Sequence, residues 1–173
     1  MKKNLSQLSK RKNIPKCVFD TSSVIALIEI CQLGGVLQKF SKKTSLYVPH
    51  RVRDEFLNGP QPQKDIVAFK KIFSISSVIL KKELLPYFNF DSDCGEIWVI
   101  SYAIKNPECW CVMDEEFGRN ICRLFKVKLI GTMGIISHLR NLGYLTNTDL
   151  IRLKKSLRDS TFYLPEKFLT NEE

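Results

Sequence analysis

The stretch Cys17-Val18-Phe19-Asp20-Thr21-Ser22-Ser23-Val24-Ile25 decides the fold class. Its first three residues are apolar, too few for a helix, and partly β-branched or aromatic, so they predict a short buried strand. Residues 21–23 carry hydroxyls that suit a helix N-cap. An apolar face then predicts a helix directly after the strand, made of Val24, Ile25, Leu27, Ile28 and Leu33.

The same alternation continues along the chain. Further buried strands are predicted at residues 46–48, 110–113 and 127–130. Further helices are predicted from Pro49 to Asn58, Lys64 to Phe73, Asp91-Ser92-Asp93 to about Asn106, Met133 to Leu142 and Thr148 to Arg158, with a short terminal element at 161–164. Strands that alternate with helices are typical of an α/β fold with a central, mostly parallel sheet.

Length and composition favour one folded domain in a reducing compartment. The chain has 173 residues, of which 44% are hydrophobic and 26% charged, which excludes a largely disordered or fibrous protein. The longest apolar run, 17–31, contains Asp20 and Glu29, so no membrane span is predicted. Six cysteines are too few for a secreted disulfide scaffold and no signal peptide opens the sequence, so the cytoplasm is expected.

The net charge of +9 is concentrated at the start of the chain. Residues 1–16 hold six basic residues and no acid, which leaves 21 basic and 18 acidic residues elsewhere. A basic tail favours a polyanionic partner such as nucleic acid, although a solvated terminus that aids solubility explains the same charges. We therefore divide the chain into a basic tail, 1–16, and a single domain, 17–173.

Four carboxylates are expected to meet at one edge of the sheet. Asp20 and Asp114 each end an apolar strand, where an unpaired buried carboxylate is unfavourable. The carboxyl ends of parallel strands share one edge, and ligands bind there. Glu55 and Glu96 lie near the starts of the helices that begin above that edge.

Crowded carboxylates repel one another unless protons or a hard cation neutralise them, and oxygen ligands suit Mg²⁺ or Mn²⁺. Such a cation assists the in-line displacement of phosphodiester hydrolysis. The alternative is structural: Asp20 and Asp114 are helix N-caps, and Glu55 and Glu96 are solvated or form salt bridges.

Other common sites find little support in the sequence. The cysteines include only a Cys-x-Cys pair and show no second pair with zinc-ligand spacing, so we interpret them as core residues. His50 and His138 have no glycine-flanked serine to form a hydrolytic triad. The phosphate-binding glycine patterns of nucleotide-binding proteins are absent from the sequence.

Four motifs in order resemble the PIN domain family, most closely the VapC-like ribonucleases and related nucleic-acid-binding PIN proteins. The first is Val18 to Ile25, and the second runs from Val48-Pro49 to Glu55-Phe56. The third is Asp93-Cys94-Gly95-Glu96 with the helix after it. The fourth is Asp114 to Arg119 followed by Gly131 to Gly134, although Glu115 stands where close relatives often carry a second Asp.

This resemblance implies a three-layer α/β sandwich with metal-binding, catalytic acids at Asp20, Glu55, Glu96 and Asp114. It also implies a Mg²⁺- or Mn²⁺-dependent ribonuclease that cleaves single-stranded RNA. A toxin that forms a homodimer and is inhibited by a small antitoxin protein is implied as well. Candidate substrate-binding residues are Arg119, which alternatively pairs with Glu115, and the hydroxyl residues Thr21, Ser22 and Thr132, which alternatively act as helix caps.

Two other functions stay open. The first is a catalytically silent PIN fold that binds RNA, which the basic tail would serve equally well. The second is a haloacid-dehalogenase-like phosphatase that uses Asp20 as the nucleophile. That family requires a second Asp two residues later, where this chain has Ser22.

Overall fold

The structure is a computed structural model that describes residues 16–160 and Phe162. Its centre is a five-stranded sheet in the order β3-β2-β1-β4-β5, and all four strand pairings are parallel. The strands are β1 (Cys17–Phe19), β2 (Leu46–Pro49), β3 (Ser74–Ser76), β4 (Trp110–Val112) and β5 (Leu129–Ile130). The predicted α/β class with a mostly parallel sheet is confirmed.

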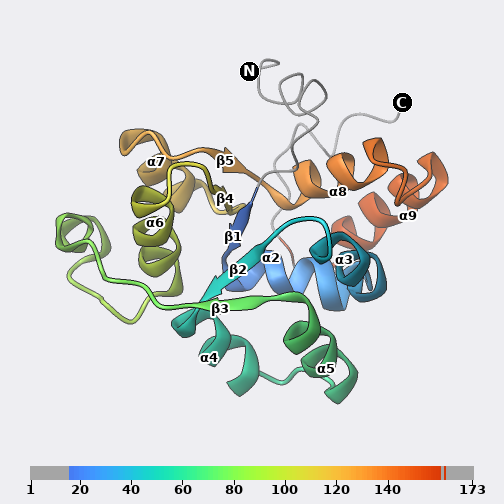
Figure 1. Cartoon of the computed structure of the whole chain (residues 1–173), viewed down its shortest axis with the longest axis horizontal. Coiled ribbons are helices and arrows are strands. Elements are labelled where there is room, and N and C mark those ends of the chain that lie inside the picture. The colour runs from blue at the N-terminus through green and yellow to red at the C-terminus, as the bar shows by residue number, and fades with distance from the viewer. Residues whose placement is uncertain (1–15, 161, 163–173) are drawn as a thin grey trace.

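Helices cover both faces of the sheet and complete the three-layer sandwich. Figure 1 shows α6 (Gly95–Lys105) and α7 (Glu116–Leu124) on one side, with α8 (Thr132–Asn141) and α9 (Asn147–Arg158) on the other. The remaining helical segments are α2 (Thr21–Ile25), the π-helical η1 (Ala26–Ile30), α3 (Gly34–Ser41), α4 (His50–Asn58), α5 (Gln63–Ile72) and the 3₁₀ segment η2 (Lys82–Phe88).

Three local expectations were wrong. The first helix ends at Ile30 rather than Leu33, because Gln32 has a left-handed φ of 54° that turns the chain into a separate helix, α3. The helix after Asp91-Ser92-Asp93 begins at Gly95, because the Asp91 carboxylate accepts from the Asp93 N–H in a preceding turn. The strand predicted at 127–130 pairs only at Leu129–Ile130.

The core is continuous from one helical layer through the sheet to the other. All residues of β1 are buried, and Leu27, Leu37, Ile100 and Leu157 pack from the surrounding helices. Within the described residues, no single helix is long and apolar enough to cross a membrane; Thr21–Ile30 and Gly34–Ser41 meet that test only as a pair bent by 118°. The predicted tail, 1–16, lies outside the described residues except for Lys16, as does most of 161–164.

The register of the two central strands sets the position of the site. Phe19 of β1 pairs with Val112 of β4, so both strands end together and the chain continues into Asp20 and Asp114 at the same edge. The Asp20 N–H donates to the Val112 carbonyl at 3.2 Å and extends the pairing by one bond.

Candidate active site

Asp20 is held rigidly between β1 and α2. It is the N-cap of α2, and its carboxylate accepts from the Ser23 N–H at 2.8 Å and from the Ser22 hydroxyl at 3.0 Å. The side chain is almost fully buried, with 3% exposed. Asp20 is therefore a helix cap, as the structural alternative predicted. It is also a buried carboxylate that lines the cavity at the edge of the sheet.

Asp114 is held by a different set of donors. Thr132, at the start of α8, donates its backbone N–H to both carboxylate oxygens, at 3.0 and 3.1 Å, and its hydroxyl to Oδ2 at 2.6 Å. The N-cap of α7 is Glu115, so Asp114 does not cap the helix that follows it. A buried carboxylate with this many donors is fixed in place without an ion pair to a basic side chain among the described residues.

Ser23 joins the two aspartates. Its backbone N–H donates to Asp20, while its hydroxyl donates to Asp114 Oδ2 at 3.2 Å and to the Val112 carbonyl at 3.4 Å. One fully buried residue therefore sets the spacing between both carboxylates. The sequence alone indicates only a cap at this position, because Ser23 is three residues after an N-cap Asp and its contact with Asp114 spans 91 residues.

Glu55 and Glu96 come from two helices that pack against each other. Glu55 on α4 accepts from the Thr21 hydroxyl and lies 4.0 Å from the Arg51 guanidinium. Its carboxylate also lies against Gly95, where an added Cβ would be 2.6 Å from Oε2. Gly95 therefore permits α4 and α6 to approach at this point.

Glu96 makes a similar contact with α7. A Cβ on Gly118 would lie 2.9 Å from Glu96 Oε1, so the first turn of α7 passes directly over that oxygen. Glu96 Oε1 is buried and has no hydrogen-bond partner within the described structure. Glu96 Oε2 lies 3.6 Å from the Cys94 thiol.

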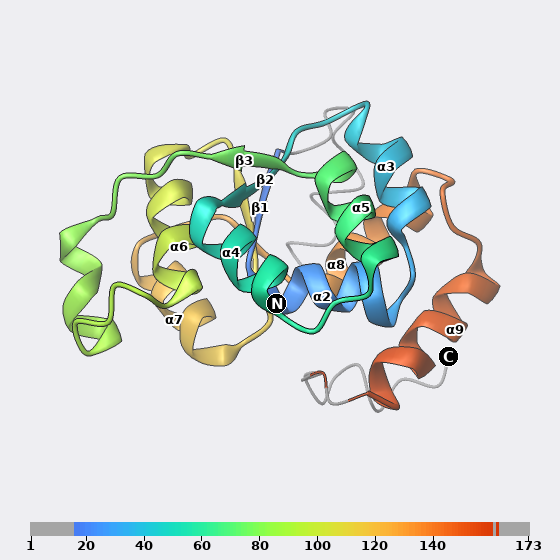
Figure 2. The same cartoon turned by 90° about the horizontal axis from the view of Figure 1, so that it is seen from below.

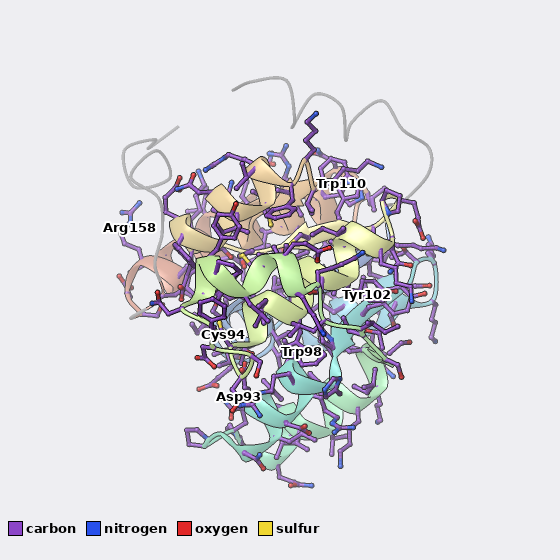
Figure 3. All side chains as sticks on the ribbon, turned by 90° about the vertical axis from the view of Figure 1, so that its left-hand side faces the viewer. Asp93, Cys94, Trp98, Tyr102, Trp110 and Arg158 are labelled. Carbon is purple, nitrogen blue, oxygen red and sulfur yellow. The ribbon has the colours of Figure 1, made fainter. Side chains whose placement is uncertain are left out.

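These side chains surround a single open cavity of about 390 Å³ at the carboxyl edge of the sheet. Figure 2 shows α2, α4, α6 and α7 around this edge, and Figure 3 shows Asp93 and Cys94 close together on the α6 side. The lining residues are Asp20, Thr21, Ser22, Ile25, Glu55, Cys94, Gly95, Glu96 and Glu115. Three of the four predicted acids line the cavity, whereas Asp114 lies behind it, bonded to Ser23.

Burial raises the pKa values of Asp20, Asp114 and Glu96. Burial raises the pKa of Asp20 to about 7, with a contribution from the charge of Asp114. Burial also raises the pKa of Asp114, against the opposing effect of the Thr132 and Ser23 hydrogen bonds. The pKa of Glu96 is raised by burial and by the nearby charges of Glu115 and Glu55. The cavity is therefore a region where negative charge is unfavourable in the protein alone.

A family model described as PIN domain matches residues 16–171, which is most of the chain. The chain belongs to the PIN domain family. PIN domains are typically metal-dependent nucleases. No curated protein matches the chain.

The PIN domain's acids suit a divalent cation by their chemistry. Their donors are carboxylate oxygens, which Mg²⁺ and Mn²⁺ prefer, and Glu96 Oε1 is a buried oxygen without a partner. Across residues 16–160 and 162, no three His, Cys, Asp or Glu side chains are grouped closely enough to hold one ion between them. The acids therefore fit a cation in donor type and burial, but the described structure does not bring three of them around one point.

The hydroxyl residues of the PIN domain have different surroundings. Thr21 and Ser22 line the cavity and donate to Glu55 and Asp20, so they contact both the acids and the open space. Thr132 is fully buried and its donors face Asp114. That placement is typical of a residue that positions an acid.

Arg119 lies near Asp114 and does not pair with Glu115 among the described residues, whereas its contact with a substrate phosphate stays a prediction. Its guanidinium donates to the Met113 carbonyl at 2.7 Å and lowers the pKa of Asp114 by its charge, and it forms no ion pair with Glu115. A Cβ on Gly131 would lie 2.6 Å from Asp114 Oδ1 and 3.4 Å from the guanidinium, so both groups crowd this glycine. Arg119 thus lies beside Asp114 and is not among the residues that line the cavity.

Proposed function

We propose that the protein is a metal-dependent endoribonuclease that hydrolyses phosphodiester bonds in single-stranded RNA. The observation that carries the proposal is one cavity lined by Asp20, Glu55 and Glu96, with the unpartnered oxygen of Glu96 buried beside it. Membership of a family of mostly metal-dependent nucleases supports it.

Asp20, Glu55, Glu96 and Asp114 are the residues that would hold Mg²⁺ or Mn²⁺. A bound cation supplies charge neutralisation at the phosphate and a lower pKa for the attacking water. The chain's own contribution is positioning: Ser23 and Thr132 fix the two aspartates, and Thr21 fixes Glu55. These bonds keep acids that repel one another at one edge of the sheet.

The test compares wild type with Asp20→Asn on a labelled single-stranded RNA, with added Mn²⁺ and with a chelator. Asn keeps the size of the side chain and one oxygen but removes the charge that binds the cation, so cleavage should be lost while the fold remains. Equal cleavage by both proteins, or wild-type cleavage that survives the chelator, would contradict the proposal. Asp114→Asn should behave as Asp20→Asn does.

The experiment also separates the alternatives. A wild type that binds RNA and metal but does not cleave would favour a catalytically silent RNA-binding PIN domain. Release of phosphate from small phosphomonoesters in place of RNA cleavage would favour the phosphatase, although Ser22, which donates to Asp20, occupies the position of the second Asp that such enzymes need.

The proposal extends to a toxin that acts as a homodimer in the cytoplasm and is inhibited by a small antitoxin protein. The cysteines carry thiols rather than disulfides, which supports a reducing compartment. Expression of the wild type should arrest growth and Asp20→Asn should not. Growth arrest by both variants would contradict a toxin role that depends on the nuclease.

A further inference from the structure

Two exposed phenylalanine residues lie on segments that also contribute lining residues to the cavity, although neither ring is itself part of the lining. Phe117 is 51% exposed and Phe90 is 73% exposed. Phe117 follows the cavity residue Glu115 by two positions, and Phe90 precedes the cavity residue Cys94 by four. The two segments that contribute lining residues from the α6 and α7 side therefore each carry an exposed ring.

Phe117 is fixed close to the acids. It lies in the first turn of α7 next to Gly118, whose backbone passes over Glu96 Oε1. Its ring packs edge-to-face on Phe88, with ring centroids 5.3 Å apart, so one edge is held while much of the ring faces solvent. Through this contact the end of η2, two residues before Phe90, packs against the first turn of α7.

Phe90 occupies a backbone conformation that is unfavourable for a bulky residue. Asn89 and Phe90 have left-handed φ angles of 49° and 61° where η2 ends. The turn itself is made by backbone bonds, from the Phe90 N–H to the Leu85 carbonyl and from the Asp91 N–H to the Phe88 carbonyl, both at 2.8 Å. Glycine or asparagine would make those bonds with less strain. A strained, exposed aromatic side chain indicates a functional demand on the ring.

From these observations, and resting on the proposed function, we infer that Phe117 and Phe90 stack on nucleobases next to the phosphate held in the cavity. Every base offers a flat π-face, and proteins bind single strands by stacking bases on exposed aromatic rings. Bases in a duplex are already stacked on one another. The two rings would thus select single-stranded substrate at a site whose acids make no such distinction.

The occupant is inferred from the continuity of the rings with the cavity. Gly118, which lies against Glu96 Oε1, is the next residue in the chain after Phe117, so a strand whose phosphate lies at the acids has an exposed ring close by. A second copy of this chain or another protein on the same rings is the opposing outcome, and sedimentation distinguishes it.

The test measures binding of a short single-stranded RNA that contains 2-aminopurine, with chelator present to prevent cleavage. Fluorescence anisotropy gives the affinity, and quenching of 2-aminopurine reports stacking. Phe117→Leu keeps apolar packing on Phe88 without a flat ring, and Phe90→Gly relieves the left-handed strain. Each should weaken binding roughly 5- to 100-fold, as for loss of one stacked base, and reduce quenching. Phe117→Tyr should bind and quench as wild type does.

Ile151→Ala is the matched control, because Ile151 is 71% exposed on α9 and its loss should change neither affinity nor quenching. Thermal melts distinguish a ligand role from a structural one, since Phe90→Gly should melt no lower than wild type. If both Phe variants bind RNA and quench 2-aminopurine as wild type does, while wild type cleaves RNA, the stacking inference is wrong and the proposed nuclease activity stands. Quenching that depends on the rings without any cleavage would support the stacking and overturn the nuclease. If the Phe variants bind RNA as wild type does but sediment differently, the rings form a protein interface. That result also overturns the inference.

Discussion

Thr132 holds the Asp114 carboxylate with both of its donors, the backbone N–H at 3.0 and 3.1 Å and the hydroxyl at 2.6 Å. Both residues are buried, and they come from the ends of the neighbouring strands β4 and β5. The pairing of those strands therefore places a helix start, with its unsatisfied N–H groups, directly beside an acid. This arrangement stabilises a negative charge that burial alone would disfavour.

We predict that Thr132→Val lowers the cleavage rate or the apparent Mn²⁺ affinity by about 10- to 100-fold, the usual effect of removing a hydrogen bond that positions a metal ligand. Valine matches threonine in shape, so the loss isolates the hydroxyl donor. Titration of Mn²⁺ in the cleavage assay measures both quantities. Thr132→Ser, which keeps the hydroxyl, is the control. Equal activity of Thr132→Val and wild type would contradict the role of Thr132 in positioning Asp114.

The class of fold and three of the cavity acids followed from local sequence signals. Short apolar runs that end in Asp, followed by hydroxyl residues, predict a strand, an edge and a helix start, and the structure has those features at Asp20. Glu96 lines the predicted edge from the first turn of α6, and Glu55 lines it from the second turn of α4.

The rest depends on contacts between distant residues. The edge strand β3 is only Ser74–Ser76, two of whose residues are exposed, so it has no apolar run to reveal it. From the sequence alone, Gly118 is an ordinary glycine in a helix. Only the structure shows that Glu96 of α6 lies against it. The sequence likewise indicates only a cap residue at Ser23. The register of β1 and β4 brings Asp114 to the Ser23 hydroxyl.

We predict that Gly118→Ala impairs both stability and cleavage. The new Cβ would collide with the sulfur of Met113, which is fully buried, and would lie 2.9 Å from Glu96 Oε1. Overpacking of this kind costs about 1–3 kcal/mol, more than the helix propensity that alanine gains. Displacement of Glu96 should reduce cleavage by about tenfold or more. Melts and cleavage rates measure the two effects.

The matched control for this substitution is Gly35→Ala. Gly35 is in α3 with nothing within 4 Å of an added Cβ, so alanine should stabilise the protein by about 0.5–1 kcal/mol and leave cleavage unchanged. If Gly118→Ala melts as high as Gly35→Ala and cleaves RNA at the wild-type rate, the close approach of α7 to Glu96 has no functional importance.

Deletion of residues 1–15 should weaken RNA binding and reduce its dependence on salt, while the rate at saturating RNA stays unchanged. The deleted segment carries Lys2, Lys3, Lys10, Arg11 and Lys12 and no acid, so it can add phosphate contacts but not cavity carboxylates. Binding titrations at two salt concentrations measure the slope. Unchanged affinity and slope would identify the tail as a solubility element.

We predict that Asp20→Asn raises the melting temperature of the metal-free protein, and that the gain grows with pH. The pKa of Asp20 is about 7 in the folded state, because of burial and the charge of Asp114, and about 3.9 in an unfolded chain. The folded state therefore binds this proton more tightly, so its stabilisation is complete below about pH 4 and is lost as the pH rises towards 7. Asn has no proton to lose, so the variant should exceed wild type by roughly 4 °C or more at pH 8 and by less at pH 5. Melts in chelator at both pH values measure the difference.

Asp149→Asn is the control with the opposite sign. Hydrogen bonds from Thr146 lower the pKa of Asp149, so its ionised form stabilises the fold above the unfolded pKa and that stabilisation is lost as the pH falls. Asn at position 149 should thus lower the melting temperature at pH 8, where Asn at position 20 raises it. Because both substitutions remove one carboxylate charge, a general effect of net charge would shift both proteins in the same direction. A fall in the melting temperature of Asp20→Asn at pH 8 would contradict the crowding of charge between Asp20 and Asp114, and with it the physical reason for a cation at this edge of the sheet.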